Sequence, residues 1–166
     1  GIAFGLRESD SALKHSYLNL SASGEFVINV CSDSYATDHI ETIAHEYPAD
    51  VNEFTIVGWH TQESIKVAPP SVAEAPAHLE CRVSEEIGLG RSAAQVAFVV
   101  AEVLAITFDE RVLLDGDVDH PRVDGFALGA IGRAGGRTFV RCNEESVYYQ
   151  ERPPLPGADP SFLSQL

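Results

Sequence analysis

Residues 77–89 read AHLECRVSEEIGL, and this stretch carries the clearest structural signal in the chain. Leu79, Cys81 and Val83 alternate with charged neighbours, which is the period-two pattern of a strand with one buried face. Residues 96–108, VAFVVAEVLAITF, predict a second long strand. The connection between them, which begins GLGR at residue 88, lacks the helix and lysine of a phosphate loop. We therefore interpret it as the turn of a long antiparallel hairpin.

Shorter elements flank this hairpin on both sides. The patterns predict strands at 2–4, 26–30, 138–142 and 146–149, and helices at 11–20 and 35–45. Asp10 or Ser11 could cap the first helix, and Gly24 would end it. Residues 53–75 are irregular and 113–125 form an acidic loop. Strands and helices do not alternate as in a parallel sheet, so we expect a mainly β, α+β architecture.

The composition limits the possible partners and compartment. The 166 residues correspond to about one domain, and 11 Lys and Arg against 25 Asp and Glu give a net charge of −14. Such a charge repels nucleic acid and anionic membrane surfaces. The longest apolar run, 96–101, ends at Glu102, far short of a membrane span. No signal peptide is visible, and three widely spaced cysteines fit a reduced, cytoplasmic protein better than a disulfide scaffold.

Motifs for hydrolysis, nucleotide binding or metal binding do not occur in the sequence. His39 and His45 are six residues apart and would face different sides of one helix, so we do not expect a shared metal. The acidic stretch 109–119 lacks the register of a calcium loop, and we interpret it as solvated surface. The sequence therefore predicts no metal centre.

Lys14 is the strongest candidate for a binding residue, because the chain has only one other lysine, Lys66. Arg7 precedes it, and Ser9, Ser11 and Ser16 surround it near the start of a predicted helix. Two cations, several hydroxyls and the free N–H groups of a helix start are suited to binding a phosphate. A solvated basic patch on an amphipathic helix explains the same residues equally well.

Five segments together resemble the flavin reductase-like, FMN-binding split-barrel family. They are KHSYLNLSASGEFVIN at 14–29, NEFTIVG at 52–58, PSVAEAPAHLECR at 70–82, AEV at 101–103 and IGRAGG at 131–136. Each segment alone is weak evidence for the family, but the order and spacing of all five over residues 5–153 are specific to it. The resemblance assigns residues 1–153 to one such domain and leaves 154–166 as a C-terminal tail.

The resemblance implies a six-stranded antiparallel split β-barrel with flanking helices, in which the family's strands before Ile2 are missing from this chain. It also implies a homodimer that holds FMN at the subunit interface and uses NADH or NADPH as co-substrate. Lys14 and Ser16 match the block that lies at the flavin phosphate in the family, and Arg7 and Ser11 are weaker candidates for the same cofactor site. No catalytic acid or base is expected, because the flavin performs the hydride chemistry.

Two departures from the family pattern keep several functions open. His15 stands where the family has Asp, and Ala94-Gln95-Val96-Ala97 lacks the histidine associated with nicotinamide binding. The first hypothesis is an NAD(P)H:flavin reductase that supplies a monooxygenase partner. The alternatives are an FMN-binding flavoprotein that does not reduce free flavin, or a truncated member that acts only in assembly.

Arginines near glycine-rich turns are the candidates for a nicotinamide-nucleotide site. Arg133 and Arg137 could bind the nucleotide phosphates together with nearby backbone N–H groups. The alternative is that both arginines pair with surface carboxylates, which are abundant in this chain.

Overall fold

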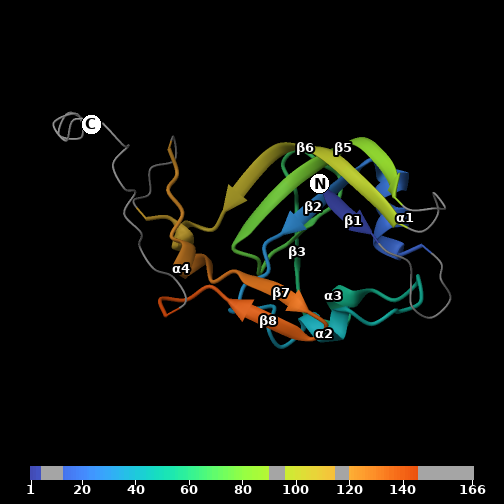
Figure 1. Cartoon of the computed structure of the whole chain (residues 1–166). Coiled ribbons are helices and arrows are strands. Elements are labelled where there is room, and N and C mark those ends of the chain that lie inside the picture. Colours follow the sequence, from blue (N-terminus) through green and yellow to red (C-terminus); the bar gives the residue numbers. More distant parts are fainter. Residues whose placement is uncertain (5–12, 90–95, 115–119, 146–166) are drawn as a thin grey trace, which may run out of the picture.

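A four-stranded antiparallel sheet forms the centre of the molecule (Figure 1). The computed structural model describes residues 1–4, 13–89, 96–114 and 120–145. The strand order is β1-β6-β5-β2, with β1 at Ile2–Phe4, β2 at Glu25–Asn29, β5 at Ala77–Leu89 and β6 at Val96–Phe108. The predicted long hairpin is confirmed, because β5 and β6 pair antiparallel along their whole lengths.

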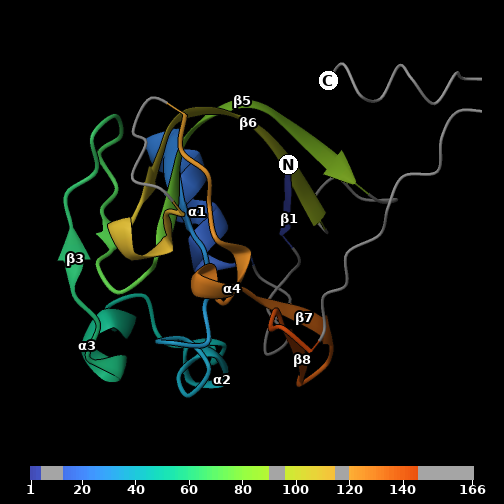
Figure 2. The ribbon, with the colours of Figure 1, turned by 90° about the vertical axis from the view of Figure 1, so that its left-hand side faces the viewer.

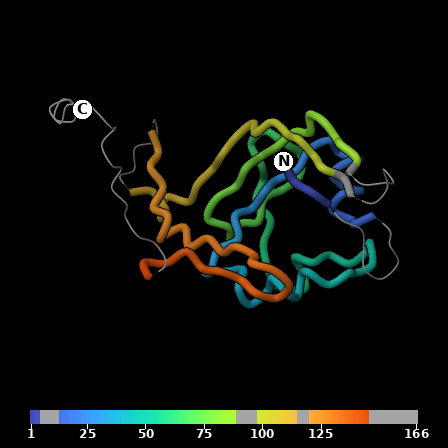
Figure 3. Tube along the Cα trace, viewed as in Figure 1, coloured from blue at the N-terminus to red at the C-terminus, as the bar shows by residue number. Residues whose placement is uncertain are grey.

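The two long strands are bent rather than flat. The register between β5 and β6 shifts at Glu80/Cys81 and again at Val83/Glu85, which are β-bulges. Bulges bend a strand and increase its twist, and Figure 3 shows the Cα trace of β5 and β6 arching over β1 and β2. The sheet is therefore a curled antiparallel half-barrel, and the expectation of a mainly β fold with few helices is confirmed.

Short elements surround the half-barrel. The helices are α1 (His15–Ser23), α2 (Ile40–Ile43), α3 (Glu53–Val57), the 3-10 turn η1 (Glu110–Val112) and α4 (Gly125–Leu128). Two small antiparallel pairs join β3 (Thr61–Gln62) to β4 (Ser71–Val72) and β7 (Ile131–Gly135) to β8 (Thr138–Arg141). Figure 2 shows α2 and the β7–β8 hairpin together at one end of the molecule, away from the arch. None of the described helices is long and apolar enough to cross a membrane.

The second predicted helix is much shorter than residues 35–45, because only Ile40–Ile43 is helical. The residues before it form turns, in which the Ala36 N–H donates to the Ser32 carbonyl and the Ile40 N–H donates to the Ala36 carbonyl. Ser, Thr and Asp side chains, which are frequent at 32–38, favour turns over helix interiors. The first helix also starts later than predicted, at His15, but it ends at Gly24 in the left-handed conformation, as the sequence indicates.

The predicted strand at 138–142 is present as β8, which pairs with β7. Its predicted partner, residues 146–149, lies outside the described residues. Gly135 and Gly136 have φ values of 141° and 51°. These positive angles allow a tight turn, which brings the IGRAG segment back against β8. The irregular stretch 53–75 likewise contains α3 and the β3–β4 pair.

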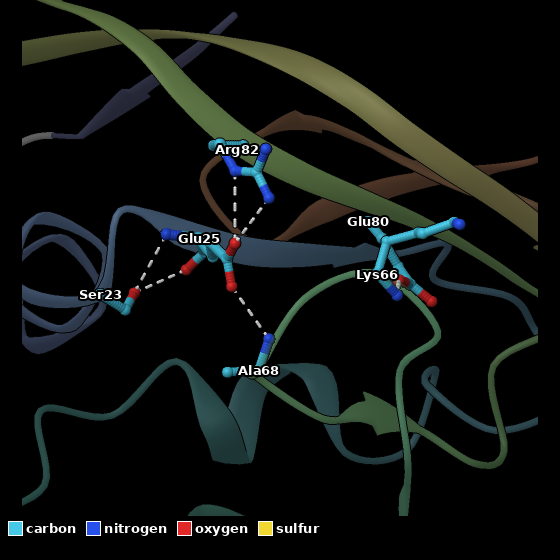
Figure 4. Close-up of polar contacts among 6 residues, drawn as sticks. All are labelled: Ser23, Glu25, Lys66, Ala68, Glu80 and Arg82. Atoms are coloured by element: carbon cyan, nitrogen blue, oxygen red, sulfur yellow. Dashed lines mark hydrogen bonds and ion pairs between the residues drawn. The ribbon is translucent and has the colours of Figure 1, made fainter.

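One face of the sheet carries polar side chains that fix the loop before β4 (Figure 4). Glu80 is 1% exposed, and its carboxylate accepts hydrogen bonds from the backbone N–H groups of Ile65, at 2.8 Å, and Lys66. Glu25 accepts from the Ala68 N–H at 3.0 Å and forms an ion pair with Arg82. These carboxylates therefore hold residues 65–68 against the sheet.

The opposite face is apolar, as the register shows. Residues that pair directly share a face, so Phe26, Cys81 and Val103 lie in one row across the sheet. The row of Ile28, Leu79 and Ile106 lies beside it on the same face. Cys81 is 1% exposed, which confirms that this thiol packs as a small apolar side chain, and burial raises its pKa. Val103 and Ile106 are 45% and 53% exposed, so part of this face is uncovered in the single chain.

Candidate functional site

A pocket of about 430 Å³ lies at the start of α1 and joins four parts of the chain. Lys14 and Ser16 line it from α1, Glu46 from the segment after α2, Glu53 from α3, and Arg133 from β7. The remaining lining consists of His15, Ile43, Ala44, His45 and Tyr47. Two cations and a hydroxyl named from the sequence are thus brought together, although Arg133 is far from the other two along the chain.

The start of α1 lies at this pocket. Lys14 is the residue that caps the helix, and its carbonyl accepts from the N–H groups of Tyr17 and Leu18. The first N–H groups of a helix have no partner within the helix, and they carry partial positive charge. The first turn contains no acidic residue, and no side chain caps it. This end of α1 is therefore suited to an anionic ligand.

Carboxylates balance the cations of the pocket. Lys14 Nζ lies 3.2 Å from Glu46 Oε1, and the two side chains are 39% and 19% exposed. Burial raises the pKa of the Glu53 carboxyl, and the nearby His15 opposes that shift. The pocket is lined by two cationic and two acidic side chains besides its two histidines. A ligand that binds here must compete with Glu46 for Lys14.

The arginines proposed for the nicotinamide converge on a single carboxylate. Arg133 Nη2 lies 3.3 Å from Glu41 Oε1, and Arg137 Nε lies 3.5 Å from Glu41 Oε2. Arg133 also donates to the Gly136 carbonyl at 2.7 Å and stacks over Phe139. These contacts tie the β7–β8 hairpin to α2, so a nicotinamide-binding role for both arginines stays a prediction.

A second pocket, of about 410 Å³, adjoins the first at Ser16, which lines both. Phe4 of β1, Leu20 of α1 and Phe26 of β2 give it an apolar character. Its other lining residues are Ile2, Asn19, Ser23, Glu25, Val27, Ile28, Pro69 and Pro70. The two pockets together provide a charged end and an apolar end within one turn of α1.

The structure thus brings together some of the residues that the sequence singled out and not others. Lys14, Ser16 and Arg133 share the charged pocket, whereas Arg137 lies beside Glu41 outside its lining. Arg7 and Ser11 lie outside the described residues. Sequence reasoning missed Glu46, because its contact with Lys14 spans 32 positions and no local pattern marks it. The described residues contain no group of acidic, histidine or cysteine side chains that could hold a metal ion.

Comparisons with known proteins identify the family of this chain. The family model for the flavin reductase like domain matches residues 2–120. An uncharacterized protein of Deinococcus radiodurans is 33% identical over 129 residues, which cover 78% of this chain and 54% of that protein. The chain therefore spans about half the length of this relative.

Two solved structures share the fold. Component B of nitrilotriacetate monooxygenase from Bacillus cereus has a TM-score of 0.73 and 23% identity, over 86% of this chain and 68% of that chain. The FMN-binding domain of a flavin reductase-like enzyme from Shewanella baltica has a TM-score of 0.61 and 18% identity, over 90% of this chain and 73% of that chain. Since the family model covers most of the chain and the fold agrees with both structures, this protein belongs to the flavin reductase-like domain family.

Proposed function

We propose that this chain binds FMN, with the phosphate in the charged pocket at the start of α1 and the flavin ring in the adjoining apolar pocket. The observation that carries this proposal is the position of Ser16, which lines both pockets. Membership of the flavin reductase-like family and the fold shared with an FMN-binding domain support the same cofactor.

The residues present fit the two ends of this cofactor. A phosphate requires cationic side chains, hydroxyls and backbone N–H groups, and Lys14, Ser16, Arg133 and the start of α1 supply them. A flat, mostly apolar ring requires aromatic and aliphatic walls, which Phe4, Leu20 and Phe26 supply. Volumes of about 430 and 410 Å³ are typical for small-molecule sites.

The reaction proposed is the NAD(P)H-dependent reduction of flavin. When bound, FMN supplies the acceptor for a hydride from the nicotinamide. The part of the protein is to bind and orient two flat rings and to exclude water between them. Lys14 and Ser16 would anchor the cofactor by its phosphate, and the apolar walls would orient its ring. No side chain has to transfer a proton in this scheme.

Two measurements test the proposal on the full chain. Titration with FMN should produce saturable binding, with a change in the flavin absorption or fluorescence. Stopped-flow mixing of the FMN-loaded protein with NADH and with NADPH should then bleach the flavin absorbance within seconds. Absence of FMN binding would overturn the cofactor assignment, and binding without bleaching would overturn the reductase assignment alone.

A second candidate function is an FMN-binding flavoprotein that does not reduce free flavin. Two observations favour it: the sequence lacks the family's nicotinamide-associated histidine at 94–97, and Glu41 already pairs with both Arg133 and Arg137. The stopped-flow experiment separates this candidate from the reductase. A role in assembly alone would show neither FMN binding nor bleaching.

The proposal extends to a homodimer and to a monooxygenase partner. Val103 and Ile106 leave an exposed strip on the apolar face of the sheet, which a second copy could cover. Multi-angle light scattering at micromolar concentration should give twice the mass of the chain, and a monomeric mass would contradict the dimer.

The similarity to a monooxygenase component supports a partner that consumes reduced flavin.

A further inference from the structure

Glu46 occupies the position that an anionic ligand would take beside Lys14. Its Oε1 lies 3.2 Å from Lys14 Nζ, at hydrogen-bonding distance and within the charged pocket. The carboxylate is the more buried partner of the pair, at 19% exposure against 39% for the lysine. A carboxylate and a phosphate use the same lysine in the same way, through charge-assisted hydrogen bonds.

We propose that Glu46 competes with the phosphate of the flavin for Lys14 and thereby determines how strongly the pocket prefers phosphorylated over unphosphorylated flavin. This inference rests on the proposed function, because it concerns the same pocket. Binding of FMN would separate Glu46 from Lys14 and leave the carboxylate near the incoming dianion. Riboflavin has no phosphate, so its binding would leave the Lys14–Glu46 pair intact.

The surrounding charges make Glu46 the deciding group. Arg133, the other cation of the lining, is already held by Glu41 and by the Gly136 carbonyl. Glu53, the other acid of the lining, comes from α3, and burial raises the pKa of its carboxyl. Lys14 is therefore the cation most available to a phosphate, and Glu46 is the carboxylate placed against it. α2 finishes at Ile43, and Glu46 lies beyond it in a segment without regular secondary structure.

The test compares Glu46→Gln with the parent chain, using FMN and riboflavin as the two probes in fluorescence or calorimetric titrations. The amide keeps the size of the side chain and removes its charge. We expect FMN to bind about three- to tenfold more tightly to the variant, because the replaced contact is a partly exposed ion pair. Riboflavin affinity should not change.

The matched control is Glu86→Gln. Glu86 also contacts α1, through the hydroxyls of Tyr17 and Ser21, but it does not line the charged pocket. This substitution makes the same change in net charge against the same helix, so a general electrostatic effect would appear in both variants. In the Lys14→Ala background, Glu46→Gln should improve FMN affinity by less than about twofold, because the lysine for which Glu46 and the phosphate compete is absent.

The outcomes separate this inference from the proposed function. If the parent chain binds FMN and Lys14→Ala weakens that binding, but Glu46→Gln leaves it unchanged or weaker, the competition is wrong and the cofactor assignment stands. Equal tightening of FMN and riboflavin, or an equal effect of Glu86→Gln, also overturns it. If neither the parent chain nor the Glu46→Gln variant binds FMN, both the cofactor assignment and the competition are wrong. Glu46→Ala serves as a second variant, and thermal melting verifies that each protein folds.

Discussion

Glu80 is a buried and Glu46 a half-buried acidic side chain, and they are held in opposite ways. Glu80 of β5 is 1% exposed, and its partners are backbone N–H groups of residues 65 and 66. Glu46 lies in an irregular segment, and its carboxylate pairs with the side chain of Lys14. Backbone donors cannot leave without unfolding the loop, whereas a lysine can change partners when a ligand arrives. The first carboxylate therefore fixes the fold, and the second lies where exchange is possible.

The largest expected effect comes from Glu80→Ala. The substitution leaves the backbone N–H groups of Ile65 and Lys66 without their acceptor and opens a cavity at the buried position of the Glu80 side chain. We expect a loss of about 3–5 kcal/mol in the free energy of unfolding, a large part of the total for a domain of this size. Glu46→Ala should cost less than about 1 kcal/mol, because its ion pair is partly exposed.

Urea denaturation followed by circular dichroism measures both losses. Glu80→Gln is the matched control, because the amide oxygen keeps one acceptor and should lose less stability than alanine. Equal losses for Glu80→Ala and Glu46→Ala would contradict the distinction between a fixed and an exchangeable carboxylate.

The next effect concerns the cation that Glu46 holds. Lys14→Ala should weaken FMN binding about ten- to a hundredfold, which corresponds to the loss of a charge-assisted contact of about 1.5–3 kcal/mol. Fluorescence titration measures it, and Lys66→Ala is the control, since Lys66 is the only other lysine and does not line the charged pocket. Unchanged FMN affinity in Lys14→Ala would move the phosphate away from this pocket.

The sequence predicted the sheet well because its signal is local. The alternation of Leu79, Cys81 and Val83 with charged residues indicates both the strand and its buried face, and β5 and β6 have the predicted bounds. The helix expected at 35–45 is limited to Ile40–Ile43, because the Ser, Thr and Asp side chains at 32–38 favour turns. The sequence did not indicate β7, whose pairing with β8 depends on the turn at Gly135-Gly136.

Half of the charged pocket could be predicted in the same way. Lys14 and Ser16 stand close together at a helix start, and the family block marks them. Glu46 and Glu53 reach the pocket only through tertiary packing, over separations that no periodicity or motif covers. Arg133 was predicted to bind the nicotinamide nucleotide. It lines the same pocket as Lys14 because the β7–β8 hairpin folds onto α2.

Glu41 is a third carboxylate, and it pairs with both Arg133 and Arg137. If nucleotide phosphates replace it at Arg137, then Arg137→Ala should raise the KM for NADH or NADPH about three- to tenfold and leave FMN affinity unchanged. Arg133→Ala should affect both ligands, because Arg133 also lines the charged pocket. Steady-state kinetics with each nucleotide measures these changes. Unchanged KM in Arg137→Ala would assign the Glu41 contacts to holding the hairpin on α2.

The smallest expected effect concerns Asp109, whose ion pair with Arg111 lies on the surface beside η1. Hydrogen bonds from the Arg111 side chain and from its backbone N–H lower the pKa of the Asp109 carboxyl to about 2, from an ordinary value of 3.8. A pKa that is lower in the folded state stabilises the fold above about pH 4, and this contribution disappears as the pH falls from about 4 to 2. Asp109→Asn should therefore lower the melting temperature at pH 7 by about 1–2 °C, and this difference from the parent should shrink toward pH 2. Thermal melts at a series of pH values measure it, with Arg111→Gln as the matched change on the other side of the pair. A difference that stays constant from pH 7 to pH 2 would show that the carboxylate charge contributes nothing here. Asp109 would then stabilise η1 only through the shape of its cap, as a neutral side chain also can.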